Sequence, residues 1–513
     1  MSAPQIESET FSSVDAAWLH MDTTTNLAVI VGVISFDISP DFERLKHMFE
    51  TRLLVHNRFK QRVSESESRW GRPVWEADPE FDIENHLIKL KLPEPADHQA
   101  LQHLVGDLMS EPLDPSRPLW QFMLIENYQA GGALVCRIHH AIADGLVLVQ
   151  LMLSIADTQS DVPEPVIQVE EEEEEIAEDG FLFRLLIPVI EAALMLNHAY
   201  RKTSAFIHKG MATISNPAQL MTTARLSVNL SKALAKLLLI PPDRKTILRG
   251  RCGTSKKTAW TTACSLDEVK DIAQMMGGTV NDILISAITG ALRRYLEEHG
   301  EQVLGMNIRA VVPVNLRTSD AIDLSGNRFG LVFLSLPVGI LDPLKRLVIL
   351  RHRMNEIKNS PEAVVAMGIL SAIGMTPTQI EHVIVTIFGM KGTAVMTNVP
   401  GPRQPLYFVG ARIENLMFWV PMPGNLGLGV SIISYAGKVT LGVATDEGII
   451  PDPESILKNF QDEMKFLRQW GRPRETKKAR GEDTNHCQSI TRSGYPCKNR
   501  PLPGSKYCRL HSG

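Results

Sequence analysis

The spacing of apolar residues along the chain predicts two mixed units of strands and helices. In the first unit, residues 1–165, the apolar run LAVIVGVISFDI is typical of a strand. FERLKHMFETRLLVH and HQALQHLVGDLMSEPL instead carry apolar residues three and four positions apart, which is the spacing of helices. Strand-like and helical segments that alternate in this way favour a mixed α/β fold.

The second unit, residues 246–470, repeats this alternation. LDEVKDIAQMMGG predicts a helix that stops at glycine, and TVNDILISAITGALRRYLEEHG predicts a long helix that begins near Asn281-Asp282. Strands are predicted for IRAVVPVNL, LVFLSLPV, TAVMTNV, LGLGVSIISY and VTLGVATD. Ala436-Gly437 joins the last two as a hairpin signal, and PESILKNFQDEMKFLRQW predicts a closing helix.

Three further segments connect these units with each other and with the C-terminus. Residues 166–180 contain the run Glu170–Glu175, whose like charges repel and predict a solvated acidic linker. Residues 181–245 have helical, apolar spacing with scattered basic residues. They form either a bridge between the domains or a helix pair lying on a lipid surface. Residues 471–486 are charged without apolar periodicity and predict a tether.

The composition is that of a globular protein and disfavours a nucleic-acid binder. The chain has 513 residues, 44% of them hydrophobic, and a formal net charge of −5 at pH 7. The N-terminus lacks the basic and apolar regions of a signal peptide. The stretch AVVAMGILSAIGM is shorter than the about 20 apolar residues that a membrane span needs. Because the six cysteines are also few and unevenly spaced, we expect a cytoplasmic protein.

Candidate chemistry first appears in RIHHAIADGL, where an apolar strand ends on two histidines and a helix follows. Successive strand side chains point to opposite faces, so His139 and His140 cannot both face one cavity. One of them is a candidate reagent and the other a structural neighbour. Asp144 stands where a helix N-cap is expected, and Gly145 suits a tight turn.

Several stretches together resemble the bacterial wax ester synthase/acyl-CoA:diacylglycerol acyltransferase family. Over about residues 10–470, in the family's order, the chain contains FSSVDAAWLHMD, PLDPSRPLW, HHAIADG, TVNDILISAITGALRRYL, VPVNLR, GNRFG and TNVPGP. The resemblance implies an α/β (α+β) fold of two chloramphenicol-acetyltransferase-like domains with a channel between them. Acyl-CoA would enter this channel from one side and the alcohol acceptor from the other.

The resemblance assigns the role of general base to the second histidine, His140, and a supporting role to His139. Asp144 and Gly145 would support the loop. A neutral imidazole can take the proton of an alcohol during attack on a thioester and then return it to the CoA sulfur. The sequence has no G-x-S-x-G motif around a candidate serine, and Cys136 lies within the predicted strand. We therefore expect direct transfer without an acyl-enzyme.

Two other motifs carry site residues by the same resemblance. Asn281 is a possible oxyanion donor, although asparagine also favours a helix N-terminus, and Asp282 is assigned a structural role. Pro118, Leu119 and Trp120 match the family's PLW motif. Their apolar character suits either the wall of the substrate channel or the core.

A compact cluster of cysteines follows the tether and is not part of this resemblance. Residues 487–511 contain Cys487, Cys497, Cys508 and His511 but few apolar residues, so they are too small to fold around a core of their own. Three thiolates and one imidazole would make a four-coordinate structural zinc site. The alternative is a disordered tail with free thiols.

Taken together, the sequence predicts an acyltransferase that transfers a fatty acyl group from acyl-CoA to diacylglycerol, a long-chain fatty alcohol or both. The products would be triacylglycerol and wax ester, and catalysis would need no cofactor. Two alternatives are a related CoA-dependent acyltransferase with another acceptor and an inactive lipid-body scaffold. The expected partners are the substrates and a peripheral membrane or lipid-droplet surface at the inner membrane face.

Overall fold

The computed structural model describes two compact units, Met1–Lys465 and Phe466–Gly513. The described residues are 9–64, 72–160, 236–237, 239–316, 327–373 and 385–471, followed by 487, 497, 499–503, 505–506 and 508–511. The predicted acidic linker and nearly all of the predicted connecting segment and tether lie outside these residues.

A six-stranded sheet forms the centre of the N-terminal half. Its strands lie in the order β13 (Tyr407–Phe408), β14 (Ala411–Trp419), β2 (Val29–Phe36), β7 (Gly132–His139), β6 (Trp120–Ile125) and β5 (Leu87–Leu90). Neighbours are antiparallel except for the parallel pair β5–β6. All eight residues of β7 are buried, so the strand that leads to the two histidines runs through the interior.

A larger sheet forms the centre of the C-terminal half. Its path is β11 (Phe329–Leu336), β10 (Ile308–Asn315), β12 (Ala394–Pro400), β15 (Leu428–Tyr435), β16 (Lys438–Asp446) and β8 (Lys256–Trp260), with β9 (Cys264–Ser265) also on β16. β12 is parallel to both of its neighbours, and the other pairs are antiparallel. A third, small sheet joins β1 (Glu9–Thr10), β4 (Val74–Ala77) and β3 (Gln61–Ser64).

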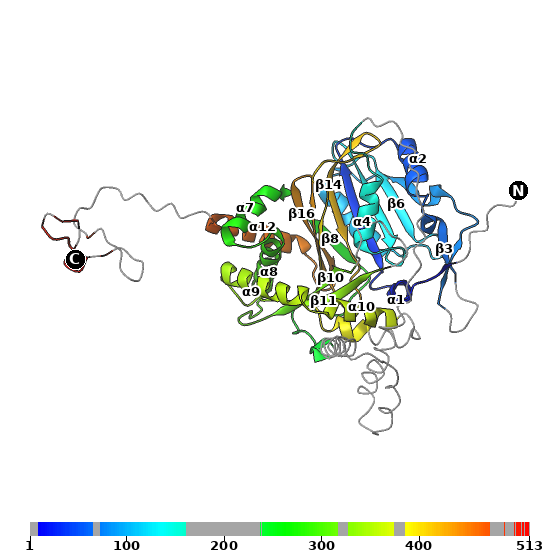
Figure 1. The fold of residues 1–513 in the computed structure, drawn as a ribbon. Coiled ribbons are helices and arrows are strands. Elements are labelled where there is room, and N and C mark those ends of the chain that lie inside the picture. Colours follow the sequence, from blue (N-terminus) through cyan, green and yellow to red (C-terminus); the bar gives the residue numbers. More distant parts are fainter. Residues whose placement is uncertain are drawn as a thin grey trace, which may run out of the picture. The chain divides into compact units, whose positions relative to one another are not determined.

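Helices pack beside these sheets (Figure 1). They are α1 (Ser13–Met21), α2 (Phe42–Arg52), α3 (His98–Ser110), α4 (Gly145–Ser154), α7 (Leu266–Met276), α8 (Val280–Glu298), α9 (Pro343–Lys358), α10 (Glu362–Ile373) and α12 (Pro453–Gly471). The short 3-10 helices are Asn57–Lys60 and Ile83–Asn85. In Figure 1, α4 lies against the sheet that contains β6 and β14, whereas α7, α8 and α9 lie beside the larger sheet.

The C-terminal half of the chain contributes two strands, β13 and β14, to the sheet of the N-terminal half. β14 comes from the C-terminal half but pairs with β2, with Trp419 opposite Val31. The ring of Trp419 also lies 5.4 Å from that of Trp260, on β8 of the larger sheet. One buried apolar cluster therefore contains residues from both sheets. The predicted division at residues 1–165 and 246–470 describes the order of the chain, but the sheets do not follow it strictly.

The mixed α/β fold predicted from the sequence is confirmed, and so are its locally encoded elements. Helix α7 ends before Gly277, whose φ of 68° is the left-handed conformation that glycine favours at a helix end. The β15–β16 hairpin turns at Ala436 and Gly437, with φ of 45° and 76°. Two positive φ values in a two-residue loop match the right-handed twist of the strands.

Within the described residues, no single helix is both long and apolar enough to cross a bilayer. The bent pair α7–α8 meets that test together, by length and composition alone. Much of α8 is buried within the protein, as is usual for a core helix.

Candidate active site

The turn between β7 and α4 holds His140 in the interior. β7 ends at His139, and α4 begins at Gly145 after its N-cap residue Asp144. The Asp144 carboxylate accepts a hydrogen bond from the backbone N–H of Val147 at 3.0 Å, which satisfies one free donor of the helix end. The predicted strand, turn and helix are thus confirmed, and the turn is fixed at both of its ends.

Backbone hydrogen bonds tie His140 to both halves of the chain. Its N–H donates to the carbonyl oxygen of Ala28 at 2.7 Å, and its own carbonyl oxygen accepts from Nδ2 of Asn327 at 2.8 Å. Asn327 also donates to Oδ1 of Asp15, from its backbone N at 3.0 Å and from Nδ2 at 2.6 Å. Asp15 is buried, and this burial raises the pKa of its carboxyl to about 6.

The imidazole of His140 is enclosed by aromatic rings. The Trp18 ring stacks on it, with centroids 4.0 Å apart and planes 13° apart, and the Phe329 ring lies 5.4 Å away. Burial removes the imidazolium from water and lowers the pKa of His140 to about 3. His140 is therefore neutral at pH 7, which is the protonation state that can accept a proton.

His139 faces different partners. Its Nδ1 accepts a hydrogen bond from the backbone N–H of Ala141 at 3.1 Å, and its Nε2 lies 3.4 Å from Oδ2 of Asp22. Accepting at Nδ1 leaves the proton on Nε2, the nitrogen that faces the Asp22 carboxylate. This arrangement agrees with the strand alternation, because His140 and not His139 lines the cavity described next.

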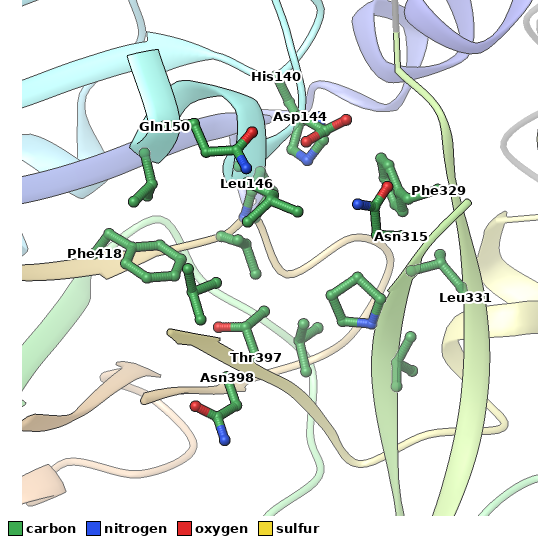
Figure 2. A pocket seen from close by; sticks show the side chains of 18 of the residues that line it. His140, Asp144, Leu146, Gln150, Asn315, Phe329, Leu331, Thr397, Asn398 and Phe418 are labelled. Carbon is green, nitrogen blue, oxygen red and sulfur yellow. The ribbon is translucent and has the colours of Figure 1, made fainter. Parts of the chain in front are cut away.

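A cavity of about 360 Å³ opens beside His140 (Figure 2). Figure 2 shows side chains from both halves converging on it, among them Leu146 and Phe418 on one side and Leu331 on the other. Its polar lining groups are His140, Asp144, Gln150, Asn315, Thr397 and Asn398. A mainly apolar cavity with a few convergent polar groups is typical of a small-molecule site.

Two smaller apolar cavities share walls with this one. The first, about 60 Å³, has Val149, Leu153 and Phe418 in common with it. The second, about 70 Å³, has Val311, Leu331 and Pro423 in common with it. Two small apolar cavities therefore lie next to the main one, behind shared side chains.

Asn281 and Asp282 lie at the start of α8, near the cavity but outside its described lining. Oδ1 of Asn281 accepts a hydrogen bond from Nδ2 of Asn398 at 2.7 Å, and Asn398 does line the cavity. Asp282 forms a capping box with Thr279, in which each side chain accepts from the other's backbone N–H. Asn281 thus reaches the cavity through Asn398, whereas Asp282 stabilises the helix end.

Pro118, Leu119 and Trp120 belong to the core rather than to the described wall of the cavity. All three are buried, and the Trp120 Nε1–H donates to the carbonyl oxygen of Phe59 at 2.8 Å. The Trp120 ring stacks on His86 with centroids 4.6 Å apart. This packing favours core packing, the second of the two predicted roles, and these residues are not among the described lining of the cavity.

Gly145 serves the turn through its small size. Its backbone is not in the left-handed region that would require glycine. A Cβ at this position would instead lie 3.3 Å from Cγ1 of Val420, a closer approach than most side chains tolerate. Glycine here therefore leaves space beside Val420, which lines the cavity.

The predicted cysteine cluster comes together in the C-terminal unit, taken by itself. The ligand atoms of Cys487, Cys497, Cys508 and His511 all lie within 4.8 Å of one another. The three thiols are buried and unpaired by disulfides. The four residues chosen from their spacing in the sequence are therefore neighbours in space.

Sequence reasoning missed Asp15, Trp18, Asn327 and Phe329, which surround His140. They lie in FSSVDAAWLHMD and GNRFG, two of the stretches that carried the family resemblance. The available signal was the place of these residues within the two stretches, each of which contains several polar residues. Nothing in the sequence alone indicated that Asp15 and Asn327 would be hydrogen-bonded to each other.

The sequence of this chain matches known family models and known proteins. Residues 11–284 match the sequence model of the wax ester synthase/diacylglycerol acyltransferase catalytic domain, and residues 325–468 match that of the WS/DGAT C-terminal domain. A probable diacylglycerol O-acyltransferase of Mycobacterium tuberculosis is 26% identical over 484 residues, which cover 92% of this chain and 98% of that protein. The O-acyltransferase WSD of Acinetobacter baylyi is 27% identical over 408 residues, which cover 77% and 82%.

Solved structures share the fold. The wax ester synthase/diacylglycerol acyltransferase from Marinobacter aquaeolei superposes with a TM-score of 0.63 at 21% identity, covering 90% of this chain and 99% of that one. The trichothecene 15-O-acetyltransferase of Fusarium sporotrichioides gives a TM-score of 0.58 at 12% identity, covering 90% and 94%.

Proposed function

Because the chain belongs to the wax ester synthase/diacylglycerol acyltransferase family and is an acyltransferase, we propose that His140 is the general base that activates the acceptor. The acyl group passes from acyl-CoA to the hydroxyl of diacylglycerol, of a long-chain fatty alcohol or of both. The observation that carries this proposal is the buried, neutral imidazole of His140 at the wall of the central cavity.

In the proposed reaction, the hydroxyl oxygen attacks the thioester carbonyl while the neutral imidazole takes the hydroxyl proton. The tetrahedral intermediate then collapses, the carbon–sulfur bond breaks, and the imidazolium returns the proton to the leaving thiolate. The products are an ester and free CoA.

An imidazole with a pKa of about 3 is a weak base on its own. The oxyanion that forms beside it stabilises the imidazolium by charge attraction.

The turn itself supports this role. His140 is held through its backbone by Ala28 and Asn327, and its ring is held by the stack on Trp18. A base fixed in this way loses little entropy when the acceptor binds. Asp15 supports His140 indirectly, through Asn327. Its carboxylate accepts both hydrogen bonds that orient Asn327.

The oxyanion needs a preorganised donor, and Asn281 stays our candidate. Its side-chain oxygen accepts a hydrogen bond from Asn398, which lines the cavity, and this bond fixes the Asn281 amide beside the cavity wall. A donor of this kind is typically worth about 3 to 4 kcal/mol in the transition state.

Direct transfer is also supported by the state of the Cys136 thiol, four residues before His140 in the chain. Cys136 is buried on β7, and burial raises the pKa of its thiol well above the ordinary range. A thiol that stays protonated is a poor nucleophile. We therefore propose no covalent acyl-enzyme and no catalytic cofactor.

Assays of the purified full-length protein test the proposal. Palmitoyl-CoA is offered with diacylglycerol, with a panel of fatty alcohols and with small polar alcohols. We expect ester formation with the lipid acceptors, and a loss of about 10²- to 10⁴-fold in His140→Ala, the range of general-base contributions. His139→Ala is the matched control and should lose less. A folded His140→Ala protein with full activity would refute the mechanism, and preference for small polar alcohols would favour the alternative acceptor class.

We further propose that the protein works at the inner membrane face or on lipid bodies, because its acceptors dissolve in lipid. The predicted apolar and basic segment, residues 181–240, would provide the contact, and it lies almost wholly outside the described residues. Flotation with anionic liposomes measures the attachment. Leu182→Ser combined with Leu186→Ser should abolish flotation while activity in detergent persists. Unchanged flotation of the folded variant would remove this segment from the proposal.

A further inference from the structure

The C-terminal segment takes no part in the proposed acyl transfer and has an unusual interior. Beyond residue 471, the buried residues among those described are Cys487, Cys497 and Cys508, which form a cluster of their own. Leu502 and Leu510 are exposed instead. The described part of this segment therefore shows no apolar core that could offset the conformational entropy of folding.

The distances between the side chains are those expected around a single metal ion. With zinc bonds of about 2.3 Å to sulfur and about 2.0 Å to nitrogen, a tetrahedral site separates two sulfurs by about 3.8 Å and a sulfur from a nitrogen by about 3.5 Å. Here the Sγ atoms of Cys497 and Cys508 are 3.8 Å apart. Nδ1 of His511 lies 3.6 Å from Sγ of Cys487 and 3.3 Å from Sγ of Cys508.

The same distances argue against the other chemistry that cysteines offer. A disulfide requires its two sulfurs to be about 2.0 Å apart, whereas the Sγ atoms of Cys497 and Cys508 are separated by 3.8 Å. An iron–sulfur cluster is ordinarily held by several thiolates distributed over more than one iron. In contrast, all four ligand atoms here surround a single point, within 4.8 Å of one another.

The backbone around the cluster is also organised. Cys487 N–H donates to the carbonyl oxygen of Asn499 at 2.8 Å, and His511 N–H donates to that of Cys508 at 2.9 Å. Nδ2 of Asn499 lies 3.8 Å from Sγ of Cys508, where it can donate to a thiolate. Outer contacts of this kind orient metal ligands and strengthen binding.

We propose that Cys487, Cys497, Cys508 and His511 bind one zinc ion, which acts as the core of the C-terminal segment. Three sulfur ligands and one nitrogen ligand are a combination that zinc commonly uses in structural sites. All four positions are filled by the protein, so none is left for a substrate. The binding free energy of the metal stabilises the folded segment, because the unfolded segment has no preformed site.

Metal analysis of the full-length protein, purified anaerobically, tests the site. We expect about one zinc per chain, as a four-ligand structural site requires. Cys497→Ala combined with His511→Ala should lower bound zinc at least about tenfold, since even outer contacts change affinity by 10- to 100-fold. Cys264→Ala, which removes a cysteine of β9 outside the cluster, is the matched control and should keep its zinc.

Cobalt exchange supplies a readout that is independent of activity. Replacing zinc by Co²⁺ should give the visible absorption of tetrahedral cobalt with thiolate ligands in the wild-type and Cys264→Ala proteins, but not in the double variant. Absence of zinc from the full-length protein would overturn the proposal, and so would equal zinc in the double variant. Iron in place of zinc would overturn the identity of the metal.

Discussion

At the scale of single residues, burial shifts the pKa values of two groups in one hydrogen-bonded network. The two shifts make stability depend on pH in opposite directions. Burial raises the pKa of Asp15 from 3.8 to about 6, so folding favours its protonated form. The stability from this group is fully present below pH 3.8 and is lost as pH rises through 6. Burial lowers the pKa of His140 from 6.5 to about 3, so its stability is present above 6.5 and is lost as pH falls toward 3.

Asp15→Asn should separate these two contributions. The amide keeps an oxygen that can accept from Asn327, but it carries no charge at any pH. We expect the stability of the variant relative to wild type to increase between pH 4 and pH 8 by up to about 3 kcal/mol, because wild-type Asp15 must ionise in a buried site. Unfolding temperatures measured across this range check the trend. Asp41→Asn, at an exposed N-cap, is the control. If the difference in stability between variant and wild type does not vary with pH, ionisation of Asp15 does not destabilise the folded protein.

At the scale of elements, the sequence predicted those turns and helix ends that depend on residues close together in the chain. The turn from β7 to α4 follows from strand alternation and from the side chain of Asp144, which accepts a hydrogen bond from the backbone N–H of Val147, three residues further on. Helix α8 begins where Thr279 and Asp282 form their capping box. These capping residues lie within one helical turn of the backbone groups that they satisfy, so they can be recognised from one sequence alone.

Long-range pairing is what the sequence could not give. β14 pairs with β2 although Ile413 and its partner Phe36 are far apart in the chain, and no local pattern specifies that register. The choice between a channel wall and the core for Pro118, Leu119 and Trp120 stayed open for a related reason. Apolar side chains suit a cavity wall and a core equally well, and only the packing of Trp120 between Phe59 and His86 decides.

At the scale of the whole molecule, the site exists only where distant segments meet. Trp18, His140 and Phe329 come from three different parts of the chain and pack into one aromatic group. Asn327 links the carboxylate of Asp15 to the backbone of His140. A resemblance could mark the motifs in order, but the contact between them is a property of the fold. This explains why His140 was predictable and its surroundings were not.

The last prediction concerns the C-terminal segment, which lies beyond every described residue of the cavity in the sequence. The described lining of the cavity runs from Trp18 to Pro423, and the family match ends at residue 468. Helix α12 ends at Gly471. Removing residues 472–513 therefore keeps every described element of the transferase unit, and a direct acyl transfer needs no metal as Lewis acid.

We expect the shortened protein to keep its transfer rate within a few-fold and to contain no zinc. Steady-state kinetics with palmitoyl-CoA and metal analysis of the same preparation measure both properties, with the full-length protein as reference. The double variant Cys497→Ala/His511→Ala supplies a second comparison, since it retains the length of the tail but lacks two ligands. If the shortened protein folds and yet loses activity while the double variant does not, the tail contributes to catalysis through something other than its metal. If both lose activity, the metal-bound segment supports the transferase directly, and the independence of the two units is refuted.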